Sequence, residues 1–210
     1  MMLYYIGLIL NPFILLLIIL GYTKRKQYDT ANLFIFYALI FAFTSEVLMK
    51  ISGWYFKTNI VIYNISSLIE FFIFFFFYYK YLGKDISNFF YFFAILIFFV
   101  FYFIESYERG LFRMFNYSFL YKNITLMVLA VIALPKIINH GKTSVITDYS
   151  VFWINTAILV YYSCTLFIVG LRKYTLHLPN LTIVATYLHL FFIFVFFSML
   201  FTGLWKANRK

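Results

Sequence analysis

The sequence has little charge, little proline and almost no cysteine. Charged residues make up 11% of its 210 residues, and seven of them are acidic; soluble domains usually carry about 25%. With so few polar side chains to face water, a soluble fold of this composition would expose large apolar patches. The composition therefore excludes an ordinary soluble domain.

The sequence also lacks the motifs of the common enzyme classes. Its one cysteine, Cys164, excludes an internal disulfide, CxxC redox chemistry and a cysteine-rich metal site. No HExxH or HxxxH spacing, GxSxG elbow or glycine-rich phosphate loop occurs in the chain. We therefore predict no catalytic residue, no metal and no cofactor, and an enzyme is the less favoured interpretation.

The chain does contain long apolar segments. It is 65% hydrophobic, and its mean hydropathy is +0.91. A membrane-spanning helix needs roughly 20 mostly apolar residues. We therefore predict an all-α polytopic membrane protein with seven transmembrane helices in a single domain, residues 1–210. The predicted spans are about 3–22, 31–51, 59–81, 87–105, 115–135, 150–171 and 180–203, with Pro135 ending the fifth.

The net charge of +10 comes from basic residues near span ends and in short loops. We interpret them as groups that set orientation and bind lipid headgroups, not as a nucleic-acid surface. The first apolar run has no basic residue before it, and Lys24, Arg25 and Lys26 follow it, so it is predicted to be a first span and not a signal peptide. This pattern predicts the N-terminus outside and the C-terminus in the cytoplasm, with the inner (plasma) membrane of the cell as the location.

Three ionisable side chains are predicted to lie well inside the spans: Glu46, Glu70 and His189. At about 1.5 Å per residue, they lie ~8, ~16 and ~14 Å from the outer ends of their helices. All three would therefore share one half of the bilayer. Ionisable residues in spans are costly and usually face an interior or a wet cavity.

Two helices carry polar stripes that contain these residues. The stripe of the third span is Asn59, Tyr63, Ser66 and Glu70, and that of the seventh is Thr182, Thr186 and His189. Spacings of three and four residues place each set on one helix face. Both stripes become apolar further down, which predicts a pocket in the outer half of the bilayer and not a through-pore. The candidate ligand-binding residues are Glu70, His189, Glu46, Tyr63, Ser66 and Thr186.

The same residues also have a structural interpretation. Glu70 and His189 could share a proton or bind the amine or hydroxyl of a small ligand. Alternatively, they satisfy one another and fix helix packing. Glu46 lies four residues before Lys50, which favours a structural ion pair.

The stretch Tyr149–Leu171 (YSVFWINTAILVYYSCTLFIVGL), together with the seven-span plan, resembles the small seven-helix membrane modules of bacterial sensor proteins. The resemblance covers topology and one helix. It implies a sensor-like function in which an unknown small ligand shifts helix packing. Because such modules normally continue into an output domain, this chain is expected to act through a cytoplasmic or membrane signalling partner.

Three functions remain open at this point. The first is a ligand-binding or sensor-type module. The second is a small transporter built on a 3+1+3 helix repeat, because a shift of 120 residues lays the first three spans on the last three. The third is a membrane-embedded enzyme that acts on lipid. The apolar inner halves of the third and seventh spans favour the first.

Overall fold

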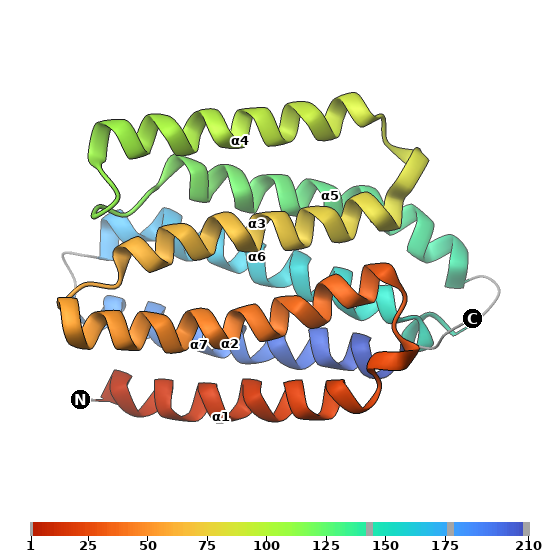
Figure 1. Ribbon diagram of the computed structural model, residues 1–210, viewed down its shortest axis with the longest axis horizontal. Coiled ribbons are helices and arrows are strands. Elements are labelled where there is room, and N and C mark those ends of the chain that lie inside the picture. Colours follow the sequence, from red (N-terminus) through yellow and green to blue (C-terminus); the bar gives the residue numbers. More distant parts are fainter. Residues whose placement is uncertain (1, 142–144, 176–178, 208–210) are drawn as a thin grey trace. The chain divides into compact units, whose positions relative to one another are not determined.

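The computed structural model describes residues 2–141, 145–175 and 179–207, and the chain in these ranges is all-α (Figure 1). Its α-helices are α1 (Met2–Thr23), α2 (Thr30–Phe56), α3 (Ile60–Leu82), α4 (Asn88–Arg109), α5 (Tyr117–Gly141), α6 (Ser150–Thr175) and α7 (Pro179–Trp205). Short 3-10 turns, η1 (Arg25–Gln27), η2 (Gly83–Asp85) and η3 (Ile146–Asp148), lie in three of the connections. Residues 1, 142–144, 176–178 and 208–210 lie outside the described ranges.

Six of these helices, α2 to α7, are long and apolar enough to cross a membrane. The described side chains of α1, from Leu10 to Thr23, form a shorter apolar segment. By helix length and hydropathy the chain is a multi-pass membrane protein, as predicted. The seven predicted spans match seven helices in order.

Local sequence explains where several helices begin and end. Asp29 caps α2 by accepting a hydrogen bond from the Asn32 backbone N–H at 2.7 Å, the usual role of an N-cap aspartate. The last helical residue before Gly110 is Arg109, and Gly110 has a φ of +69°. Glycine adopts such an angle without a steric penalty, so it ends α4 cleanly.

One predicted helix end is wrong. The fifth helix was predicted to end at Pro135, but α5 passes through this proline and ends at Gly141. The predicted second span, 31–51, lies within α2, which continues to Phe56. Proline removes one backbone hydrogen bond, yet a chain in an apolar layer remains helical because the alternative leaves many more polar groups unsatisfied.

The chain forms two compact units. The first contains the residues up to Lys122, that is α1 to α4 and the start of α5; the second contains residues 123–207. In the first unit α1 packs against α2 and α2 against α3, and in the second α6 packs against α7. The single domain expected from the sequence stays a prediction.

Aromatic rings fill the contact between α3 and α4 in the first unit. Phe71 stacks on Phe98 with 4.2 Å between ring centroids, and Phe75 meets Tyr91 edge-on at 5.5 Å. The Tyr91 hydroxyl donates to the carbonyl of Tyr78 at 3.5 Å. These five side chains are all buried. This half of α3, below Glu70, is therefore filled by packed rings.

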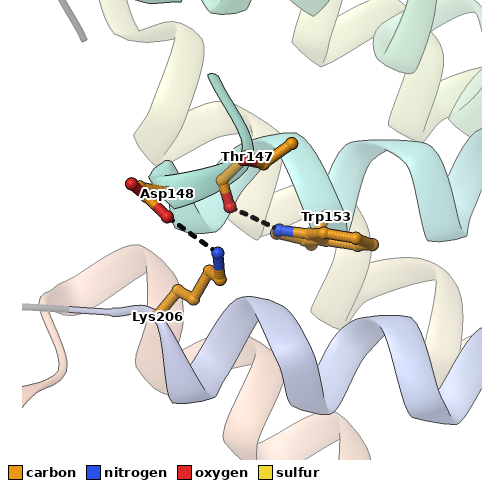
Figure 2. A network of polar contacts seen from close by, with 4 residues as sticks. All are labelled: Thr147, Asp148, Trp153 and Lys206. Carbon is orange, nitrogen blue, oxygen red and sulfur yellow. Dashed lines mark hydrogen bonds and ion pairs between the residues drawn. The ribbon is translucent and has the colours of Figure 1, made fainter. Parts of the chain in front are cut away.

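In the second unit α6 and α7 approach closely where Gly203 faces the first turn of α6. A Cβ at Gly203 would lie 2.6 Å from the Ile154 side chain and 3.0 Å from the Ser150 carbonyl oxygen. Polar contacts lie at the same ends (Figure 2). Lys206, just after α7, pairs with Asp148 in η3 at 2.8 Å. Within the η3–α6 segment, the Trp153 indole donates to a carbonyl in η3 at 2.7 Å. A small residue thus permits the close contact, as is common between membrane helices.

Candidate functional site

The first unit contains a buried ion pair that links α3 to α5. The Lys122 ammonium lies 2.5 Å from a carboxylate oxygen of Glu70. The lysine side chain is 2% exposed, whereas the glutamate side chain is 27% exposed. The Lys122 nitrogen also lies 4.8 Å from the centroid of the Phe119 ring, within range of a cation–π interaction. The carboxylate is therefore the reachable member of the pair, and the ammonium is covered.

The two charges lie at the same level because α5 begins inside the unit and not at its edge. Phe115, just before α5, donates its backbone N–H to the Asn64 side chain. Asn64 is four residues into α3, about 6 Å from its first residue. Glu70 is six residues beyond Asn64 along α3, and Lys122 is five residues beyond Tyr117 along α5. These separations correspond to about 9 Å and about 8 Å along the two helix axes, so the two side chains meet.

Asn64 fixes the connection between α4 and α5. Its amide nitrogen donates to the carbonyls of Leu111 and Arg113 at 3.1 and 2.9 Å, and its amide oxygen accepts from the N–H of Phe115 at 3.3 Å. Asn64 is 1% exposed. Non-helical backbone at this depth needs such partners, because each unsatisfied group in an apolar medium is costly.

Glu105, near the end of α4, caps the first turn of α5. One carboxylate oxygen accepts the backbone N–H groups of Asn116 and Tyr117 at 2.6 and 2.9 Å. The other accepts the N–H and the hydroxyl of Ser118 at 2.8 and 2.7 Å. Glu105 is fully buried. A carboxylate at a helix N-terminus satisfies donors that the helix leaves unpaired and interacts favourably with the helix dipole.

These groups form one polar column, which we define as Asn64, Glu70, Glu105, Ser118 and Lys122. The column is held by direct contacts between α3, α4 and α5. A recess beside Asn64 and Ser118 is lined by Tyr63, Asn64, Ser67, Tyr102, Phe115, Ser118 and Phe119.

Of the residues predicted from the sequence, three more lie on α2 or α3 in the first unit. Glu46 is half-buried on α2, and its ion pair with Lys50 stays a prediction. Tyr63 packs its ring against Phe119, with centroids 6.1 Å apart. Ser66 is half-buried on α3.

The other two predicted residues lie on α7 in the second unit. The His189 ring lies 6.2 Å from the Tyr161 ring on α6. The Thr186 hydroxyl donates to the carbonyl of Thr182 in its own helix at 2.8 Å. Because these residues and Glu70 belong to different units, the shared pocket stays a prediction.

Sequence reasoning missed four of the five members of the column: Asn64, Glu105, Ser118 and Lys122. Lys122 was interpreted as a charge that sets orientation, although it lies inside the predicted span 115–135. Glu105 was the last residue of its predicted span, and Asn64 is one position away from the predicted stripe. Lys122 could have been found from the sequence, because a lysine seven residues into a predicted span needs a buried carboxylate as its partner.

No protein-family model, curated protein or solved structure matches this chain. Among the described residues, no three histidine, cysteine, aspartate or glutamate side chains come together as metal ligands would. The functional argument therefore rests on the polar column.

Proposed function

We propose that this multi-pass membrane protein is a ligand-binding or sensor-type module whose stimulus acts on the Glu70–Lys122 ion pair. The observation that supports this is the unequal burial of the pair: the ammonium is 2% exposed and the carboxylate 27%. A proton or an ammonium group that reaches Glu70 would compete with Lys122 for the carboxylate. Lys122 would then be a buried charge without its counter-ion, which strongly favours a different helix arrangement.

The polar column provides a route from this event to helix packing. Lys122 is one helical turn from Ser118, and the first turn of α5 is tied to α4 through Glu105. Asn64 ties the preceding connection to α3. A displacement of Lys122 would therefore strain contacts among three helices, and such packed contacts tend to switch between discrete arrangements.

A transporter is the weaker alternative. A repeat-built transporter would be expected to carry polar groups at matching positions, but the residue 120 positions after Glu70 is Leu190. Below Glu70, the buried rings of Phe71, Phe74 and Phe75 occupy α3. An enzyme acting on lipid has less support. The hydroxyl that lies beside a carboxylate in the column, Ser118 next to Glu105, is buried, and this carboxylate also accepts three backbone N–H groups as the cap of α5.

In this proposal the chain is one domain in a bacterial inner membrane, with its N-terminus outside and its C-terminus in the cytoplasm. The binding region would include Glu70, Glu46 and Ser66 of the first unit, and a cytoplasmic or membrane partner would respond to the change in packing. The agents that act on a carboxylate, protons and small amines, are the first ligands to test.

The test uses single cysteines at Tyr63 and Thr186 in a Cys164→Ala background. We expect both to react with an impermeant maleimide from outside. We also expect the rate at Tyr63→Cys, divided by the rate of a free thiol under the same conditions, to change with pH or with small primary amines. In the Glu70→Gln/Lys122→Met variant, whose charges are both removed, this change should disappear. If neither cysteine reacts, or if the rate responds equally without the ion pair, the proposed function is wrong.

A further inference from the structure

The connection between α4 and α5 contains a turn with an unusual tip. The Arg113 N–H donates to the Gly110 carbonyl at 3.3 Å, which closes a four-residue turn. Its two central residues are Leu111 and Phe112, which are 39% and 71% exposed. Turn tips normally carry glycine, asparagine, aspartate, serine or proline. Two large apolar side chains exposed at a turn therefore indicate that the tip contacts something other than water.

The turn is supported from behind, so its tip cannot fold inward. Asn64 holds the carbonyls of Leu111 and Arg113, and Glu105 holds the backbone that follows. Both supporting side chains are buried. The exposed leucine and phenylalanine are thus presented by a backbone with fixed hydrogen bonds.

Arginines flank this tip on both sides. The Arg109 guanidinium carbon lies 5.4 Å from the centroid of the Tyr117 ring, which positions it beside the turn, and Arg113 is exposed. Glu108, also exposed, offsets part of this charge. Arginine binds phosphate oxygens through two parallel N–H groups. Two arginines beside an apolar tip would therefore contact the phosphate groups of a lipid layer while the tip contacts the acyl chains beneath them.

The surroundings of the turn match a membrane interface. Tyr107 and Tyr117, on either side of it, are 93% and 54% exposed. At the same end of the first unit α2 ends in Trp54, Tyr55 and Phe56, which are all at least 70% exposed (Figure 1). Tyrosine and tryptophan concentrate at the level of lipid headgroups.

We propose that residues 109–113, which we call the Arg109–Arg113 turn, are a binding site for anionic lipid. Leu111 and Phe112 enter the boundary between headgroups and acyl chains, and Arg109 and Arg113 bind the lipid phosphate. The site is distinct from the Glu70–Lys122 pair and does not depend on the proposed sensor function.

The experiment places a fluorescent reporter at the tip. The Phe112→Trp variant is reconstituted in bilayers that contain brominated phosphatidylcholine or, at equal mole fraction, brominated phosphatidylglycerol. Emission of the protein without the substitution is subtracted to remove the native tryptophans. We expect quenching by both lipids and stronger quenching by phosphatidylglycerol.

Two further variants locate the charge that carries the preference. Adding Arg109→Gln and Arg113→Gln should lower the preference for phosphatidylglycerol by about 25-fold, from about fivefold for each arginine at an anionic surface. The control pair Arg25→Gln/Lys26→Gln removes two exposed charges from the other end of the unit and should leave the preference unchanged. A thermal melt of each variant verifies folding.

Three results would overturn the proposal: absence of quenching, equal quenching by the two lipids, or a preference that survives loss of both arginines. Each result leaves the Glu70–Lys122 test unaffected, because none of these substitutions touches that pair.

Discussion

From the unequal burial of the Glu70–Lys122 ion pair we predict that removing the charge of Glu70 lowers stability more than removing the charge of Lys122. Glu70→Gln keeps the shape of the side chain but removes the counter-charge of an ammonium that is 2% exposed. The Phe119 ring at 4.8 Å cannot replace a full negative charge. Breaking a buried pair from one side typically costs about 3–5 kcal/mol, and we expect Glu70→Gln to fall in this range.

Lys122→Met should cost less. It replaces the buried ammonium with an apolar side chain of similar length and leaves a carboxylate that is 27% exposed, so the remaining charge is less buried than the ammonium that Glu70→Gln leaves behind. We expect a loss of about 1–3 kcal/mol, the cost of one poorly satisfied polar group. In the double variant no charge remains, and its stability should lie within about 1 kcal/mol of the unchanged protein or exceed it.

The assay is equilibrium unfolding in mixed micelles, followed by tryptophan fluorescence, for the four proteins of this double-mutant cycle. The expected coupling energy between the two sites is at least about 3 kcal/mol. A coupling below about 1 kcal/mol, or a larger loss for Lys122→Met than for Glu70→Gln, would refute the assignment of a covered ammonium with a reachable carboxylate.

Further predictions concern the packing around this site and in the second unit. Gly203→Ala should lower stability by about 1–3 kcal/mol because its Cβ would overlap Ile154; Gly170→Ala, which has open space, is the control and should be neutral or stabilising in the same melt. Glu105→Gln should cost about 3 kcal/mol and speed amide hydrogen exchange at residues 116–118, because an amide has one acceptor oxygen for four donors; unchanged exchange would contradict the cap. Burial raises the pKa of Tyr28, outside the spans, to about 12; its contribution to stability should be complete below pH 10 and lost as pH rises toward 12, and Tyr28→Phe should remove this alkaline dependence in pH-dependent melts.

The sequence predicted the helices well because each span is a long apolar run between charged or polar residues. The errors came from residues whose local signal opposes the wider context. Pro135 is a strong helix breaker in water, but α5 continues through it to Gly141. In an apolar medium the cost of ending a helix exceeds the cost of one missing hydrogen bond.

The site was predicted in part, and the reason lies in composition. Glu70 stands out because an acidic residue inside a span is rare and expensive. Which face of the lower half of α3 turns inward could not be derived, since phenylalanine occupies six of the seven positions 71–77 and makes every side of the helix equally apolar. Asn64 is buried while Ser66 is only partly so, although the stripe argument favoured the serine.

The partner of Glu70 was missed because depth was counted from helix ends as if all connections lay at the surface. The α4–α5 connection is instead drawn about 6 Å into the unit by Asn64, which lowers the whole first turn of α5. A lysine five residues into α5 therefore reaches a glutamate ten residues into α3. The hydrogen bonds of one buried asparagine thus help to determine which charges meet. Asn64→Leu, which removes them, should weaken the Glu70–Lys122 coupling measured in the double-mutant cycle, and an unchanged coupling would mean that α5 is held at this depth by Glu105 alone.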